Sequence, residues 1–61
     1  MMTEDDFKDY KSGDKLFIRL NPDKKTSAQL VYFKSVEDGH LNYEDMNFRK
    51  YSVELSALTP P

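Results

Sequence analysis

The chain has 61 residues, a formal net charge of −2 and no cysteine. A chain of this length has room for one domain with a small core, since it buries only about 60% of the surface that it exposes when unfolded. Without cysteine, disulfides, thiol catalysis and thiolate metal sites are excluded, and a reducing compartment is favoured. Four phenylalanines and four tyrosines supply enough aromatic surface for a folded core.

Membrane-spanning and export segments are not expected. No stretch approaches the run of about 20 apolar residues that spans a bilayer. The acidic N-terminus also differs from the basic, then apolar, order of a signal peptide. We therefore expect a cytoplasmic protein with no membrane partner.

Negative charge is concentrated at the N-terminus. Residues 1–9 contain four acidic residues and one lysine, which leaves a net charge of +1 for the rest of the chain. A nonspecific nucleic-acid binder needs a basic face that displaces counterions from phosphates. Nucleic acid is therefore a possible partner, but not the favoured one.

Residues 1–11 form an acidic N-terminal segment. Thr3 can cap a helix whose first turn contains the three acidic residues at positions 4–6, where negative charge is favourable. Phe7 and Tyr10 are three residues apart and would share one face of that helix. Two alternatives stay open: one helical turn docked by these two rings, or a frayed acidic tail.

Residues 12–61 are expected to form the domain. A turn at residues 12–14 precedes an alternating strand over residues 15–20, which turns Leu16, Ile18 and Leu20 inward. Residues 21–25 indicate a loop, because proline cannot donate to a strand ladder and Asn-Pro favours turns.

The longest strand is expected over residues 27–36. Both of its faces contain apolar residues, so we expect a bulge or sharp bend that switches faces partway along. This switch would turn Ala28, Leu30 and Phe33 inward, with Val36 as a further candidate.

The Asp-Gly pair at residues 38–39 indicates a hairpin, because it tolerates the positive φ values of tight turns. Strands over residues 40–44 and 48–54 follow, separated by a turn at residues 45–47. One helical or 3₁₀ turn and a short last strand share residues 55–59. The expected fold is therefore all-β with five strands. The expected core residues are Leu16, Ile18, Leu20, Ala28, Leu30, Phe33, Leu41, Phe48 or Tyr51, Val53, Leu55 and Leu58.

The order of these elements resembles a known small fold. The residues that carry the closest resemblance are Leu41, Tyr43, Asp45, Met46, Asn47, Val53 and Leu58. Five short strands, a long bent second strand and a helical turn before the last strand resemble the SH3-like small barrel. Residues 39–58 are most similar to its Tudor type, in which an apolar-x-aromatic strand precedes an Asp-aromatic-Gly-Asn turn. The resemblance implies an SH3-like barrel that reads methylated lysine or arginine. In this sequence, Met46 stands at the position of a cage aromatic, with no glycine before Asn47.

Catalytic and metal chemistry is not expected. His40 is the single histidine, and a lone histidine beside a turn is typically a solvated strand residue. The acidic pairs at residues 37–38 and 44–45 lack the ligand spacing of a calcium loop. We therefore expect no enzyme activity, no metal and no cofactor.

Exposed aromatic residues are the main functional candidates. Five short strands cannot bury eight aromatic rings, so some rings lie at the surface, where they pack across strands or bind a partner. The partner-binding candidates are Phe17, Tyr32, Tyr43, Tyr51, Arg19 and Arg49. The favoured hypothesis is a small non-enzymatic module that binds a protein or peptide through these aromatics.

Two other hypotheses stay open. Basic residues interleaved with aromatic ones can bind single-stranded DNA or RNA by stacking and charge neutralisation. A small domain can also gain stability as a homo-oligomer, by pairing through a barrel edge or through the N-terminal segment.

Overall fold

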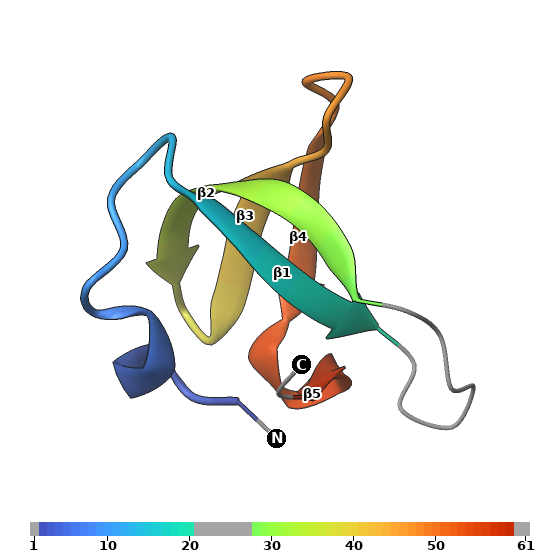
Figure 1. Ribbon diagram of the computed structural model, residues 1–61. Helices are drawn as coiled ribbons and strands as arrows, with labels where there is room; N and C mark the ends of the chain where they lie inside the picture. The colour runs from blue at the N-terminus through green and yellow to red at the C-terminus, as the bar shows by residue number, and fades with distance from the viewer. Residues whose placement is uncertain (1, 21–27, 60–61) are drawn as a thin grey trace.

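A single antiparallel sheet forms the body of the protein. The computed structural model describes residues 2–20 and 28–59. The strands are β1 (Lys15–Leu20), β2 (Gln29–Glu37), β3 (His40–Glu44), β4 (Lys50–Glu54) and β5 (Leu58–Thr59). Their order in the sheet is β4-β3-β2-β1-β5, and the sheet curls into a half-barrel (Figure 1). Two 3₁₀ turns, η1 (Glu4–Phe7) and η2 (Leu55–Ala57), precede β1 and β5.

This arrangement confirms the predicted all-β fold of five antiparallel strands. Of the two alternatives left open for the N-terminal segment, the structure has the helical turn, and the predicted 3₁₀ turn before the last strand is confirmed. The strongly curled sheet is consistent with a small SH3-like barrel. The predicted loop at residues 21–25 lies outside the described residues.

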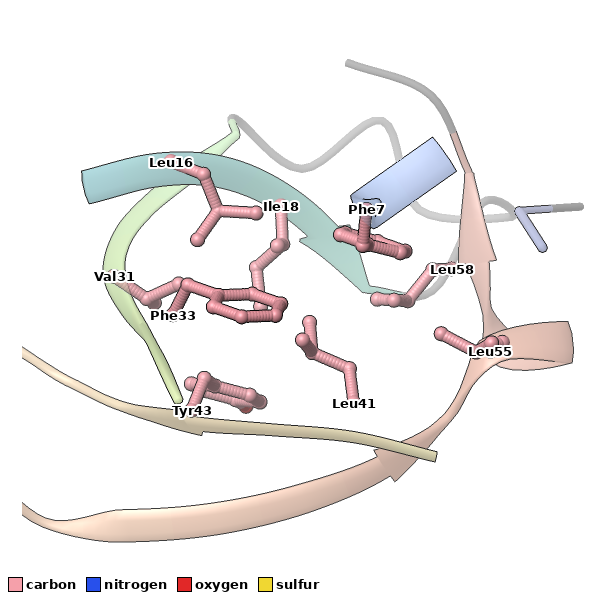
Figure 2. Packing of buried hydrophobic residues seen from close by; sticks show 9 residues of the cluster. All are labelled: Phe7, Leu16, Ile18, Val31, Phe33, Leu41, Tyr43, Leu55 and Leu58. Atoms are coloured by element: carbon pink, nitrogen blue, oxygen red, sulfur yellow. The ribbon is translucent and has the colours of Figure 1, made fainter. Parts of the chain in front are cut away.

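The core lies inside the curl of the sheet (Figure 2). Its buried members are Phe7, Leu16, Ile18, Val31, Phe33, Leu41, Tyr43, Leu55 and Leu58. The predicted burial of Leu16 and Ile18, of Phe33, and of the three leucines from β3 onward is confirmed. Leu20 and Val53 are partly buried and pack against this cluster.

β2 contains the predicted bulge, but at a later position. Val31 and Phe33 point into the core, and the register of β2 with β3 shifts between Phe33 and Ser35. After this bulge, Val36 packs against the core. One strand therefore serves both halves of the curled sheet.

The predicted inward positions of Ala28 and Leu30 were wrong. Leu30 lies opposite Phe17 of β1, and cross-strand partners share one face of a sheet. Because Leu16 and Ile18 occupy the inner face of β1, Phe17 and Leu30 lie on the outer face. Both Ala28 and Leu30 are only partly buried.

The core position predicted for Phe48 or Tyr51 is occupied by Tyr43. Tyr43 is 5% exposed, whereas Tyr51 is 43% and Phe48 is 69% exposed. Tyr51 lies opposite Tyr43 on the core side of β4, but β4 is an edge strand of the described sheet and is therefore less covered. Phe48 precedes β4 and belongs to the turn between β3 and β4.

The N-terminal segment is docked on the sheet as a helical turn. Phe7 is 3% exposed, and its ring stacks on Phe33 with the centroids 6.2 Å apart. The ring of Tyr10 stacks on the same phenylalanine at 5.6 Å. The Asp6 carboxylate accepts a hydrogen bond from the Thr3 N–H at 2.8 Å, which stabilises the start of η1.

Glu4 connects this turn to the hairpin between β2 and β3. The Gly39 N–H donates to Glu4 Oε2 at 3.1 Å, and the Leu55 N–H donates to the Gly39 carbonyl at 2.9 Å. Asp38 and Gly39 have φ values of 50° and 74°, as the predicted Asp-Gly turn requires. Three segments that are distant in sequence therefore meet at this hairpin.

We predict that Phe7→Ala lowers the free energy of unfolding by about 3 kcal/mol, because it removes a buried ring and leaves a cavity beside Phe33. Urea unfolding followed by circular dichroism measures this loss. Phe17→Ala is the control, since its ring is 55% exposed, and should cost less than about 1 kcal/mol. Equal losses in the two variants would contradict the docking of η1.

Candidate interaction surface

Three aromatic side chains lie on the outer face of the sheet, and we call Phe17, Tyr32 and Phe48 the outer aromatic patch. Phe17 is 55% exposed and lies opposite Leu30. Tyr32 is two residues further along β2, so it points to the same face as Leu30. The alternation that buries Val31 therefore also builds this patch.

Phe48 lies in the turn between β3 and β4 and stacks on Tyr32. Its own backbone conformation is unfavourable for a residue with a side chain. The two ring centroids are 5.7 Å apart and the ring planes differ by 5°. Phe48 has a φ of 64°, in the left-handed region that costs a non-glycine residue roughly 1 to 2 kcal/mol. The Asp45 N–H donates to the Arg49 carbonyl at 3.0 Å, which closes a three-residue loop whose third position favours glycine. An exposed aromatic ring therefore stands where the backbone favours glycine.

The carboxylate of Asp45 organises this turn. Oδ1 accepts hydrogen bonds from the Asn47 N–H at 2.8 Å and the Arg49 N–H at 3.0 Å. Oδ2 accepts a hydrogen bond from the Tyr51 hydroxyl at 3.3 Å. The bond from the Arg49 N–H is the main cause that holds the pKa of Asp45 below its ordinary value of 3.8. The turn predicted at residues 45–47 is therefore closed by its own aspartate.

Two of the tyrosine candidates lie on the opposite, inner side of the sheet. Tyr43 and Tyr51 are cross-strand partners, and their rings stack with the centroids 5.4 Å apart. Burial is the largest cause that raises the pKa of Tyr43, and Tyr51 and Asp45 add to it. The structure therefore brings together Phe17 and Tyr32 on one face, and Tyr43 and Tyr51 on the other.

The two arginine candidates lie on different elements, Arg19 in β1 and Arg49 in the turn before β4. Arg19 and Lys15 flank Phe17 on the outer face of β1, since alternate residues of a strand share a face. The Arg19 Nε is buried, with no hydrogen-bond partner among the described residues. Arg49 is exposed and directly follows Phe48 in the turn. Positive charge therefore borders the outer aromatic patch from β1.

An open depression of about 570 Å³ lies beside β4. It is lined by Lys34, Asn42, Tyr43, Glu44, Lys50, Tyr51 and Ser52. Several polar groups there are already paired, because Lys34 forms an ion pair with Glu44 at 3.7 Å and Asn42 donates to the Ser35 hydroxyl at 3.0 Å. The mixed charges of this depression indicate no preferred charge for a ligand.

Phe48 is the member of the patch that residue patterning gives, as an alternative to Tyr51, for a core position. One signal in the sequence points the other way. The turn between β3 and β4 contains no glycine, so a residue with a side chain must adopt the positive φ that such a turn needs.

Among residues 2–20 and 28–59, no group of three or more histidine or acidic side chains could hold a metal ion. No helix in these two ranges is long and apolar enough to cross a membrane. Comparisons with protein-family models, with curated proteins and with solved structures give no match to this chain.

Replacing Phe48 by glycine tests the strain in the turn. Phe48→Gly removes the cost of the positive φ, but also the stack on Tyr32, which is worth about 0.5 to 1.5 kcal/mol. In a Tyr32→Ala background this stack is already absent, so Phe48→Gly should raise the free energy of unfolding by about 1 kcal/mol. In the wild-type background the gain should be smaller, as a double-mutant cycle in urea measures. If Phe48→Gly destabilises the Tyr32→Ala variant, the turn is not strained.

Acid should weaken the turn through Asp45. Because the folded-state pKa of Asp45 is lowered, its stabilisation is fully present above the ordinary value and is lost as the pH falls through the folded-state pKa. Asp45→Asn preserves the shape but does not titrate. We predict that wild type is more stable than Asp45→Asn at about pH 7 and that this difference, measured by thermal unfolding, is smaller at about pH 2. A difference that is the same at both pH values would contradict this role.

Proposed function

We propose that the protein is a small non-enzymatic module that binds a protein or peptide on the outer aromatic patch. The observation that carries this proposal is Phe48, whose ring is 69% exposed although its backbone has a φ of 64°. Residues with a strained backbone persist only where the surrounding structure holds them in place, and they cluster at functional sites. Folding alone would favour glycine at this position.

The partner that we propose carries apolar side chains next to acidic ones. The exposed rings of Phe17 and Phe48 offer the type of contact area that is enriched in protein interfaces. Lys15 and Arg19 add positive charge beside Phe17 on the outer face of β1. A peptide with aromatic or aliphatic residues adjacent to Asp or Glu would match both properties.

Single-stranded DNA or RNA is the second candidate ligand, supported by the same neighbourhood of rings and basic side chains. Two observations rank it below a peptide. The net charge of −2 repels a polyanion at long range. Tyr32 and Phe48 stack on each other, so each ring has one face left for a base.

Methylated lysine or arginine, the ligand implied by the Tudor-type resemblance, is not part of the proposal. A cage for a methylated cation needs several aromatic faces turned toward one space. Tyr32 stacks on Phe48 and Tyr43 stacks on Tyr51, so these rings face one another. We therefore propose a different ligand class on an SH3-like fold, since small barrels support many functions.

Selection from a random-peptide phage library tests the proposal. Peptides with apolar residues next to Asp or Glu should be enriched on the wild-type protein. Their affinity should fall at least about tenfold for the Phe17→Ser/Phe48→Gly double variant, since truncation of central aromatic residues commonly costs this much. Lys8→Ala is the control, because this exposed lysine lies in the N-terminal segment, and it should bind as wild type does.

Titration with a fluorescent oligothymidine at low and moderate salt separates the second candidate. The ligand is a nucleic acid and not a peptide if three results coincide. The wild type binds the oligonucleotide in a salt-sensitive manner, the double variant does not bind it, and no peptide is enriched. Peptides that bind the wild type and the double variant equally, with no binding of the oligonucleotide, would exclude the patch as a binding site.

A further inference from the structure

The described sheet has two edge strands, and they differ in their capacity to pair. β5 has two residues, and Pro60 and Pro61, which lack N–H groups, follow it in the sequence. β4 has five residues, contains no proline, and all of them except Val53 are exposed. An exposed edge strand presents unpaired N–H and C=O groups to another strand. β4 is therefore the edge available for pairing.

The pairing with β3 determines which backbone groups of β4 bond to no other described strand. Hydrogen bonds flank the β3–β4 pair at both ends, from the Asp45 N–H to the Arg49 carbonyl (3.0 Å) and from the Leu55 N–H to the Gly39 carbonyl (2.9 Å). Hydrogen-bonded residues alternate along antiparallel strands, so the odd-numbered residues of β4 bond to β3. The backbone groups that point away from β3 belong to Lys50, Ser52 and Glu54.

The sequence of β4 is self-complementary in antiparallel pairing. When two copies are centred on Ser52, Lys50 lies opposite Glu54 and Tyr51 lies opposite Val53, each twice by symmetry. The three residues whose backbone groups point away from β3 then face one another, as the hydrogen-bond pattern requires. Opposite charges meet on the outer face, while Tyr51 and Val53 extend the apolar inner face.

Other registers lose this complementarity. A shift by two residues in either direction preserves the hydrogen-bond pattern but removes the ion pairs, because Ser52 then lies opposite Lys50 or Glu54. Parallel pairing in register places Lys50 opposite Lys50, and like charges directly opposite each other destabilise a sheet. Among the antiparallel registers that keep the hydrogen-bond pattern, the one centred on Ser52 pairs all five residues of β4.

We infer that two copies of the chain associate through β4, antiparallel and centred on Ser52, so that their sheets join into one. The interface is isologous, which is the commonest symmetry of soluble dimers. In this dimer, Lys50 lies between Glu44 of its own β3 and Glu54 of the second copy. The inference is independent of the proposed function, because the outer aromatic patch lies on β1, β2 and the turn rather than on this edge.

Sedimentation equilibrium with charge variants tests the dimer. The weight-average mass of the wild type should rise with concentration from the monomer value of 7.2 kDa toward twice that value. Glu54→Lys and Lys50→Glu each place like charges opposite one another in both pairs, so each variant alone should associate at least about tenfold more weakly. An equal mixture of the two variants should associate again, because a doubly positive strand then faces a doubly negative one.

Ser52→Pro tests the backbone contacts separately. The substitution removes the central N–H that points away from β3 but keeps the hydrogen bonds between β4 and β3. The monomer should therefore fold while the dimer is lost. Phe17→Ala, on the outer aromatic patch, is the control and should associate as wild type does. Circular dichroism identifies any variant that fails to fold. If Lys50→Glu fails to fold, Glu54→Lys and Ser52→Pro still test whether the dimer forms through β4. A wild type that stays monomeric at about 1 mM, or variants that associate as strongly as wild type, would overturn the inference.

Discussion

Phe33 connects three parts of the fold. Its N–H donates to the Asp14 carbonyl at 2.7 Å, and its carbonyl accepts from the Gly13 N–H at 2.8 Å, which extends the pairing of β2 beyond the start of β1. Its ring packs against Phe7 and Tyr10 of the N-terminal segment. The bulge of β2 follows directly after it. Docking of the N-terminal turn and the change of register in β2 therefore involve the same residue.

How much of the fold could be predicted differs from strand to strand for a physical reason. In β1, apolar residues alternate with Phe17 and charged residues, so hydrophobicity alone identifies the buried face of Leu16 and Ile18. In β2, residues 30–33 are all apolar or aromatic, and both faces are equally suited to burial. The choice between them is made by pairing with β1 and β3, which is tertiary information. The bulge was therefore predictable, but its position was not.

The candidate surface was predictable only in part, because exposure depends on strand order. Tyr43 and Tyr51 each have a polar residue on both sides in sequence, yet β3 is an inner strand of the described sheet and β4 is an edge, so the first is buried and the second is exposed. Phe48 lies next to a strand, and its apolar side chain made it a candidate for a core position. Its position is decided by the positive φ of the turn, which hydrophobic patterning does not register. Phe17 followed from the alternation of β1, which places it opposite the buried face, whereas the outer position of Tyr32 depends on how β2 pairs with its neighbours.

The hydrogen bond between Gly39 and Glu4 also affects the local dynamics of the protein. A backbone N–H in an exposed hairpin normally exchanges rapidly with solvent. Here the acceptor comes from a turn 35 residues earlier in the chain, so the amide is released when that turn leaves the sheet, even if the hairpin stays closed. Amide protons in the core strands exchange mainly by global unfolding, whereas the Gly39 proton follows this smaller opening. One glycine amide therefore reports how often the N-terminal segment detaches from an otherwise intact domain.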